Sequence, residues 1–330
     1  MTQKPETGVL LVNLGTPEGT DYWNMRRYLE EFLSDKRVIE LPRTIWFPIL
    51  YGIILTVRPK KSGAKYARIW NYKDAESPLR TYTRSQGVKL QQRLKGENVR
   101  VDWAMRYGRP SIKDVANQMI DEGCQRILLF PLYPQYAAAT TATVCDAFFD
   151  CLKHKRIVPA IRTVPPYCDD PLYIRAIAQS IKNHIKKLDF KPERILASFH
   201  GLPKRYDTAG DPYYQQCLRT TTALRDFMGL DERQLMMTFQ SRFGREEWLQ
   251  PYTQETAESL AENGVKSIII CNPGFVSDCL ETLDEIGREV GESFIEKGGL
   301  DFSHVPCLND GEDGMMIIET MVRRELQGWI

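Results

Sequence analysis

The chain has 330 residues, a length that a protein usually divides between two domains. Hydrophobic residues make up 42% and charged residues 26%, which excludes a disordered chain, a collagen and a multi-span membrane protein. The 44 Lys and Arg nearly balance the 43 Asp and Glu, so we expect no nucleic-acid partner. Eight cysteines without a C-x-x-C pair, and an N-terminal segment without the pattern of a secretory signal, predict a cytoplasmic protein with reduced thiols.

Short apolar runs alternate with amphipathic segments along the chain. This order predicts an α/β fold with parallel sheets. The predicted strands are 9–12, 101–105 and 127–130 in the first half, and 195–199, 235–239 and 268–271 in the second; the helices between them include 253–263 and 280–294.

An apolar segment at residues 45–57 interrupts this pattern and is followed by the basic run Arg58-Pro-Lys-Lys61. It is too short for a membrane-spanning helix, which needs about 20 residues. Two interpretations remain open. The segment is either a buried helix with a basic end, or an exposed apolar lip that touches a membrane or an apolar ligand, with Trp46 and Tyr51 at the interface.

Three local patterns occur twice in the same order, which predicts an internal duplication. Leu14-Gly-Thr-Pro17 matches His200-Gly-Leu-Pro203, Arg106-Tyr-Gly-Arg109 matches Arg242-Phe-Gly-Arg245, and the turn at Gly123 matches the turn at Gly264. The first half carries about 50 additional residues, placed at about 40–85, so the apolar segment lies in an insertion. We expect one lobe at 1–165 and a second at 166–330, with the C-terminal helix packing back on the first lobe.

Two such lobes are expected to place a ligand at the carboxyl ends of their strands. His200 follows a predicted strand directly, whereas the other three histidines lie among charged or loop residues. An imidazole here suits proton transfer near neutral pH, and a hydrogen-bonded structural histidine is the alternative.

An acidic row follows the strand at 268–271. In an α-helix Asp278, Glu281 and Glu285 share one face, and this row suits a passing divalent cation. Helix capping and a solvated acidic face are the alternative. The predicted buried stripe of this helix is Leu280, Leu283, Ile286, Val290 and Phe294.

Six motifs in order closely resemble the ferrochelatase family, over nearly the whole chain. They are Val12-Asn-Leu-Gly-Thr-Pro17, Tyr133-Pro-Gln-Tyr136, Ser198-Phe-His-Gly-Leu-Pro203, Gly210-Asp-Pro212, Phe239-Gln-Ser-Arg-Phe-Gly244 and Phe275-Val-Ser-Asp-Cys-Leu-Glu-Thr-Leu283. The resemblance implies two Rossmann-like lobes with four-stranded parallel sheets, a porphyrin cleft between them and an apolar lip. It implies insertion of Fe²⁺ into protoporphyrin IX with release of two protons, the last step of haem biosynthesis.

The resemblance also implies roles for individual residues. His200 and Glu281 match the family's central catalytic pair, and iron would meet His200, Glu281, Asp278 and Glu285. Many relatives carry a histidine in place of Cys279, so iron on this side would depend on carboxylates or on the thiol. The residues expected to bind the porphyrin are Leu14, Arg68, Arg106, Tyr107, Tyr136, Ser241 and Trp248.

Some family members bind a [2Fe–2S] cluster through a C-terminal cysteine extension. Here no cluster spacing follows Cys307, so we expect no resident cofactor, with Fe²⁺ as a substrate. A coproporphyrin or cobalt chelatase, or a bilobal protein that only binds a tetrapyrrole, remain as alternatives. The expected location is the cytoplasm, with peripheral membrane contact through residues 45–57.

Overall fold

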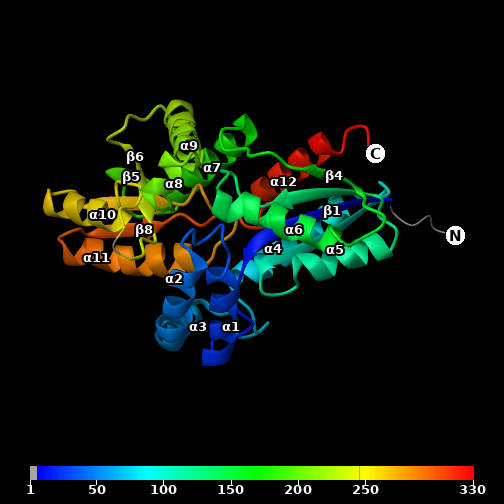
Figure 1. The fold of residues 1–330 in the computed structure, drawn as a ribbon. Helices are drawn as coiled ribbons and strands as arrows, with labels where there is room; N and C mark the ends of the chain where they lie inside the picture. The colour runs from blue at the N-terminus through cyan, green and yellow to red at the C-terminus, as the bar shows by residue number, and fades with distance from the viewer. Residues whose placement is uncertain (1–5, 245) are drawn as a thin grey trace. The chain divides into compact units, whose positions relative to one another are not determined.

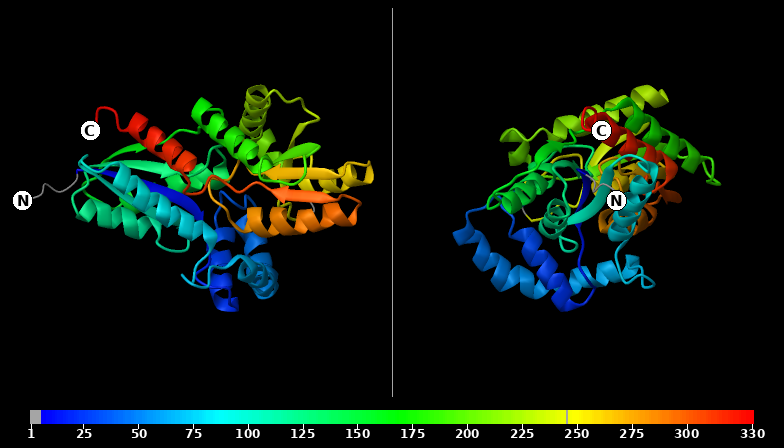
Figure 2. Two further views of the ribbon diagram at one scale, coloured as in Figure 1. Left: turned by 180° about the vertical axis from the view of Figure 1, so that it is seen from behind. Right: turned by 90° about the vertical axis from the view of Figure 1, so that its right-hand side faces the viewer.

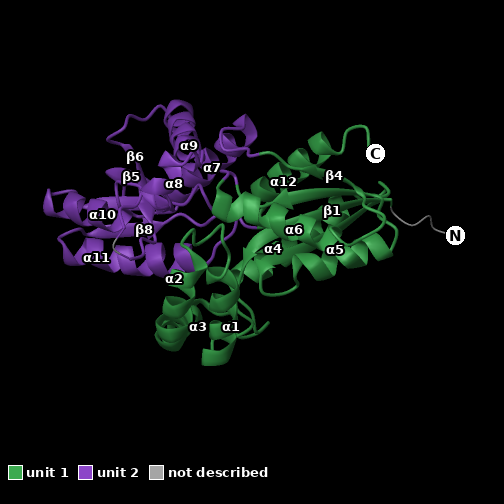
Figure 3. Cartoon of the chain, in the orientation of Figure 1, with its two compact units in different colours: residues 1–133, 137–165, 310–330 green, residues 134–136, 166–309 purple. Residues whose placement is uncertain are grey.

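The computed structural model describes residues 6–244 and 246–330. Residues 1–5 of the N-terminal segment, and Arg245 at the end of the second arginine pattern, lie outside the described residues. The chain divides into two compact units (Figure 3): unit 1 comprises residues 1–133, 137–165 and 310–330, and unit 2 comprises residues 134–136 and 166–309.

Unit 1 contains a four-stranded parallel sheet in the order β2-β1-β3-β4. Its central strand carries the run Val9-Leu-Leu-Val12, which is fully buried because helices cover both faces of the sheet. The elements of the sheet and its helices are β1 (Thr7–Gly15), α4 (Pro78–Arg93), β2 (Val99–Tyr107), α5 (Ile112–Asp121), β3 (Arg126–Pro131), η2 (Ala138–Ala142), α6 (Thr143–Leu152), β4 (Ala160–Thr163) and α12 (Glu312–Glu325).

Unit 2 repeats this topology in the order β6-β5-β7-β8, again with every pair parallel. Its core gathers buried aliphatic side chains from β5, β7, α10 and the helix after β7. The elements are α7 (Pro171–Ile185), β5 (Arg194–His200), α8 (Lys204–Thr208), α9 (Tyr213–Met228), β6 (Leu235–Gln240), α10 (Thr253–Glu262), β7 (Ser267–Cys271), η3 (Glu281–Val290), α11 (Gly291–Glu296) and β8 (Asp301–His304).

The six predicted strands are therefore confirmed, and the equal strand orders confirm the duplication. Gly15 and Gly201 are equivalent positions, because Asn13 pairs with Met105, Phe199 pairs with Phe239, and each glycine follows two residues later. A Cβ at Gly15 would collide with the Tyr107 carbonyl, and one at Gly201 would press on the Gln240 carbonyl. This close approach is the reason that both positions are glycine.

The predicted match between Arg106 and Arg242 is wrong by two residues. Met105 donates its N–H to the Pro110 carbonyl at 2.8 Å, and Phe239 donates to the Pro251 carbonyl at the same distance. This pairing makes Met105 equivalent to Phe239, and hence Arg106 to Gln240 and Tyr107 to Ser241. The two turns share an Arg-aromatic-Gly sequence, but the hydrogen-bonded ladder determines which positions correspond.

Between β1 and α4 the first half forms four helical elements, where unit 2 has only the short helix α8 between β5 and α9. α1 (Tyr22–Leu33) packs against α3 (Leu55–Ile69), and both lie beyond one end of the sheet of unit 1 (Figures 1 and 2). Between them are α2 (Arg43–Ile49) and η1 (Leu50–Ile54), which run into α3. α4 packs on β1 and β2, as α9 packs on β6, so α4 belongs to the repeated core.

The apolar segment at residues 45–57 is partly a buried helix and partly an exposed apolar surface, because it is amphipathic. Trp46, Leu50 and Leu55 are buried, and the Trp46 indole N–H donates to the Leu33 carbonyl at 2.7 Å. The placement of Trp46 at an interface is therefore wrong. The opposite face exposes Ile45, Phe47, Ile49, Tyr51, Ile53 and Val57. Among the residues described, no helix has the length and apolar character needed to cross a membrane.

Two strands were not predicted, β4 and β8. Each has four residues, lies at the edge of its sheet and is only partly buried, so its sequence lacks a long apolar run. The helix predicted at 280–294 is present, but residues 281–290 are π-helical. Its wider turn brings Thr282 and Asp284 into buried positions, whereas Leu280 and Leu283 are only half-buried.

The amphipathic character of residues 43–69 can be tested by charge substitution. Ile53 is 62% exposed and Val57 is 53% exposed, so Ile53→Asp and Val57→Asp should each keep the melting temperature within a few degrees. Leu55 is fully buried, and Leu55→Asp should lower the melting temperature by about 10 °C or more, because it places an unpaired carboxylate in the core. Thermal melts followed by circular dichroism check this, and equal effects of the three changes would contradict the described packing.

Candidate active site

His200 is the last residue of β5 and is partly buried. Its Nδ1 lies 2.7 Å from the carbonyl oxygen of Gly201. Since a carbonyl only accepts, Nδ1 must carry the hydrogen in the neutral ring, and the lone pair of the imidazole is on Nε2. The local backbone thus selects the tautomer whose Nε2 can take a proton.

Glu281 and Glu285 lie one turn apart on η3, at the start of the π-helix. Glu285 accepts a hydrogen bond from the backbone N–H of Ser241 at 2.6 Å and a second from the Ser241 hydroxyl. Burial raises the pKa of the Glu285 carboxyl, the negative charge of Glu281 adds to this, and Ser241 and His200 act in the opposite direction. Glu285 therefore interacts with both His200 and Glu281, and the three form one electrostatic group.

Ser241 reaches Glu285 because of its backbone conformation. It is a non-glycine residue with φ at +65°, in the left-handed region, directly after β6. Such strained positions persist where the surroundings hold them and are frequent at functional sites. Here the turn aims the N–H and the hydroxyl of one residue at the same carboxylate.

The preceding residue, Gln240, holds the backbone of the other glutamate. Its Nε2 donates to the carbonyl oxygen of Glu281 at 2.8 Å. Its Oε1 accepts from the Ser198 hydroxyl and from Asn272 Nδ2, each at 2.7 Å. Gln240, Ser198 and Asn272 are all buried, so this hydrogen-bond network is largely shielded from water.

The network continues to His304, whose Nε2 lies 2.9 Å from Asn272 Oδ1. An amide oxygen accepts, so His304 donates and fixes the orientation of the Asn272 amide, which in turn orients Gln240. Burial lowers the pKa of His304, although the nearby Asp278 opposes this. His304 ends β8, so the prediction that His200 is the only histidine at a strand end is wrong.

Sequence reasoning missed Gln240, Asn272 and His304 as parts of the site. Gln240 ends β6 and Asn272 follows β7 directly, and these strand-end positions are the signal that could have found them. The His304 position was hidden because β8 was not predicted.

Asp278 does not lie on the helix, which corrects the predicted helical row. It precedes η3 and is buried. Its carboxylate accepts from the Thr282 hydroxyl at 2.9 Å, from Asn309 Nδ2 at 2.7 Å and from the Cys307 N–H at 3.3 Å. These contacts make Asp278 an anchor for the start of η3; a role as an iron ligand stays a prediction.

Cys279 is buried next to Asp278, and its thiol interacts electrostatically with the Glu281 side chain. Burial raises the pKa of this thiol well above its ordinary value, and the Glu281 charge acts in the same direction. The neutral thiol is a weak ligand for a hard or borderline cation. In the described part of the chain, no three His, Cys, Asp or Glu side chains are arranged to hold a metal ion.

Two of the predicted porphyrin-binding residues of unit 2 lie near loops that flank its strands. Gly201, next to His200, lies against the ring of Trp248, and the Trp248 indole N–H is buried without a hydrogen-bond partner among the described residues. The Tyr136 backbone N–H donates to Gln216 Oε1 at 2.7 Å. Unit 2 therefore brings His200, Glu281, Glu285 and Ser241 together, with Trp248 beside them.

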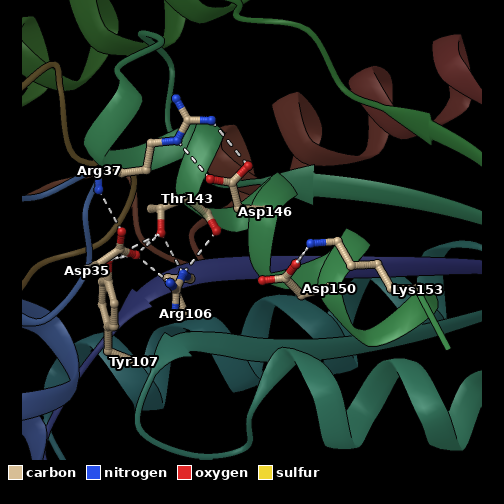
Figure 4. Close-up of polar contacts among 8 residues, drawn as sticks. All are labelled: Asp35, Arg37, Arg106, Tyr107, Thr143, Asp146, Asp150 and Lys153. Atoms are coloured by element: carbon tan, nitrogen blue, oxygen red, sulfur yellow. Dashed lines mark hydrogen bonds and ion pairs between the residues drawn. The ribbon is translucent and has the colours of Figure 1, made fainter.

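The predicted residues of unit 1 are largely occupied by internal contacts. Arg106 forms an ion pair with Asp35 and donates its Nε–H to the Thr143 hydroxyl at 2.7 Å (Figure 4). Tyr107 is fully buried, and its hydroxyl donates to Asp35 at 2.9 Å. Leu14 is half-buried near the end of β1, and Arg68 is exposed in the last turn of α3. Their roles in porphyrin binding stay predictions.

Comparison with solved structures agrees with the fold described above. The fold resembles SirB from Bacillus subtilis with Fe³⁺, with a TM-score of 0.58 and 12% identity over 97% of this chain and 95% of that one. It also resembles the sirohydrochlorin chelatase SirB from Bacillus subtilis subspecies spizizenii in complex with cobalt, with a TM-score of 0.55, 12% identity, and coverage of 97% of this chain and 94% of that one. At these identities the likeness supports the fold.

Sequence relatives are much closer. The chain is 64% identical over 327 residues to a ferrochelatase of Brucella anthropi and 62% identical over 327 residues to one of Brucella abortus. Each match covers 99% of this chain and 93% of the relative. The protein-family model for ferrochelatase matches residues 6–326. The chain therefore belongs to the ferrochelatase family, the lyases of haem biosynthesis that insert iron into protoporphyrin.

Proposed function

We propose that this chain inserts Fe²⁺ into protoporphyrin IX to give protohaem, with His200 and Glu281 as its catalytic residues. The observation that carries the assignment is the pairing of a strand-end imidazole, whose Nε2 is free to accept a proton, with two glutamates on η3. Metal insertion replaces two pyrrole protons by one divalent cation. The site therefore needs a base for the protons and anionic groups for the cation.

The contacts divide this work between the residues. His200 takes a proton on Nε2, since Nδ1 is committed to the Gly201 carbonyl. Glu281 and Glu285 supply the oxygen ligands along which Fe²⁺ approaches, as carboxylates suit this cation better than the neutral thiol of Cys279. Asp278 holds the start of η3 in place through Thr282 and Asn309.

We propose that no resident cofactor is needed and that no [2Fe–2S] cluster is bound. A cluster requires cysteine thiolates. The eight cysteines form no C-x-x-C pair, and no cluster spacing follows Cys307.

We place the protein in the cytoplasm, in peripheral contact with a membrane. Support comes from the exposed apolar face of residues 45–57 and from the exposed Lys60 and Lys61 that follow it, a combination typical of a helix lying in a membrane interface. The porphyrin substrate is itself apolar, so an apolar face near its source favours its capture.

The activity is tested by anaerobic incubation of the purified protein with Fe²⁺ and protoporphyrin IX, following the loss of porphyrin fluorescence. Coproporphyrin as the acceptor, and Co²⁺ as the metal, measure substrate preference in the same assay. Faster turnover of coproporphyrin or of cobalt would reassign the substrate, and no turnover with any combination would refute the chelatase function.

Replacement of His200 tests the base. His200→Ala should lower kcat by at least about 10²-fold, the usual contribution of a positioned proton acceptor, with little change in melting temperature. The control is His154→Ala, since His154 is an exposed residue of unit 1 and should leave turnover unchanged. Near-normal turnover of the His200 variant would assign this imidazole a structural role.

Replacement of Glu281 tests the anionic path. Glu281→Gln keeps the volume and removes the charge, so it should raise the KM for Fe²⁺ by about tenfold or more while the KM for porphyrin changes little. Glu289→Gln, on the same helix but paired with Arg288, is the matched control. A change in melting temperature without a change in KM would favour the capping interpretation.

The electrostatic group can be tested without any substrate. In protein carrying ¹³C-labelled glutamate carboxyls, NMR should show Glu285 titrating above the ordinary glutamate pKa, because burial dominates. Ser241→Ala removes a donor that stabilises the ionised form, so it should raise the pKa of Glu285 further. Glu281→Gln removes a negative neighbour and should lower it. Shifts in the opposite directions would show that these three groups do not interact as described.

A further inference from the structure

Unit 1 contains a pocket of about 750 Å³ outside the proposed active-site residues of unit 2. Three parts of the unit line it: the segment from Ser34 to Phe47, which joins α1 to α2, Arg106 near the end of β2, and the α6 residues Asp146 and Asp150. Figure 4 draws five of the charged side chains that line it, Asp35, Arg37, Arg106, Asp146 and Asp150, together with their polar partners.

Four carboxylates line the pocket, those of Asp35, Glu40, Asp146 and Asp150, and three of them form ion pairs with a basic side chain. Asp146 accepts from Arg37 Nε at 2.8 Å and from a second Arg37 nitrogen at 3.2 Å, and Asp150 pairs with Lys153 (Figure 4). Asp35 pairs with Arg106. Burial raises the pKa of Asp35, but hydrogen bonds from Thr143 and the Arg37 backbone, with the charge of Arg106, outweigh it and keep the net pKa below the ordinary value.

Two donors in the same pocket are left unsatisfied. Ser34 Oγ and Arg43 Nη1 are buried, and neither has a hydrogen-bond partner within residues 6–244 and 246–330. Buried polar groups are almost always hydrogen-bonded, so two orphaned donors in one pocket indicate an acceptor that completes them. Lys36 is exposed at the same pocket and, within the described chain, no carboxylate pairs with it.

We propose that this pocket binds a phosphate group, with Ser34 and Arg43 donating to its oxygens and Lys36 adding positive charge. Arg43 and Ser34 belong to different elements, the first turn of α2 and the C-terminal cap of α1. Donors from separate elements that line one pocket suit a tetrahedral anion, and an arginine fork binds phosphate well. The volume exceeds that of a bare phosphate, which leaves room for the group that carries it.

The surroundings of Arg43 suggest two sources for this phosphate. The guanidinium lies over the ring of Phe47, 5.3 Å from its centroid. Phe47 lines the pocket and also belongs to the exposed apolar face of residues 45–57. A lipid headgroup could thus place its phosphate in the pocket with its chains along this face, and a soluble phosphate ester would use the same donors.

Occupation would act on the segment that leads into the apolar helix. An anion held by Ser34 and Arg43 ties the end of α1 to the start of α2 and steadies residues 34–43 between them. The expected consequence is that phosphate stabilises the insertion of unit 1.

The test uses the full-length protein and two probes. Calorimetry at low ionic strength measures the binding of inorganic phosphate to the protein. Sedimentation measures the fraction of protein bound to phosphatidylglycerol vesicles, compared with phosphatidylcholine vesicles. Arg43→Met should weaken phosphate binding by about tenfold or more, and Ser34→Ala by about threefold or more, because each removes a donor. Arg109→Met is the control, since Arg109 is exposed in unit 1 and does not line the pocket.

Arg43→Lys covers the case in which the methionine variant does not fold, since it keeps the charge and loses the fork, and it should bind phosphate more weakly than the unmodified chain. If Arg43→Lys or Arg43→Met reduces binding to phosphatidylglycerol vesicles and Arg109→Met does not, the site binds a lipid headgroup. If phosphate binding depends on Arg43 but vesicle binding does not, the site binds a soluble phosphate ester. The proposal is overturned if phosphate fails to bind, or binds equally to folded Arg43 and Ser34 variants.

Discussion

The candidate active site depends on the hydrogen bonds that the turn at Gln240 and Ser241 donates to η3. Gln240 holds the Glu281 carbonyl and Ser241 holds the Glu285 carboxylate, so two adjacent residues fix two successive turns of η3. The left-handed backbone of Ser241 makes this double contact achievable. Behind it, Asn272 and His304 orient the Gln240 amide, so the position of the acidic groups is set by buried, uncharged hydrogen bonds.

The duplication explains how such a site arises from an ordinary sheet. Arg106 and Tyr107 stand at the positions equivalent to Gln240 and Ser241, and they too bind an acidic side chain, Asp35. In unit 1 a guanidinium neutralises that acid, and the pair is a structural contact. In unit 2 the equivalent residues are uncharged, so Glu285 is held in place without a fixed cation against it. The end of β2 thus forms a neutralised ion pair that stabilises unit 1. The end of β6 holds the Glu285 carboxylate with uncharged donors, so no arginine neutralises it.

Much of the fold could be predicted because it depends on patterns local in sequence. The buried runs predict six strands, and the glycines at the end of β1 and directly after β5 reveal the duplication because a neighbouring carbonyl leaves no room for a side chain there. The features that the sequence did not predict depend on hydrogen bonds and strand pairing between residues distant in the chain. The edge strands β4 and β8 are short and half-exposed, the correspondence of Arg106 with Gln240 follows from the ladder, and Trp46 is buried because the Leu33 carbonyl accepts its indole N–H.

The acidic residues of the candidate site show the same limit of sequence patterns, which do not reveal contacts between residues distant in sequence. The sequence indicates a row of equivalent acids, but a helical spacing cannot tell a carboxylate saturated by donors from one that is available. Asp278 accepts from Thr282, Asn309 and Cys307, three partners that lie up to 31 residues away, and this satisfies both of its oxygens. Glu281 interacts with the neutral thiol of Cys279, and no ion pair of Glu281 is found within residues 6–244 and 246–330. A metal ion competes best for a carboxylate that other donors and cations have not claimed, so the contacts of Asp278 set it apart from Glu281; that Glu281 meets Fe²⁺ stays a prediction.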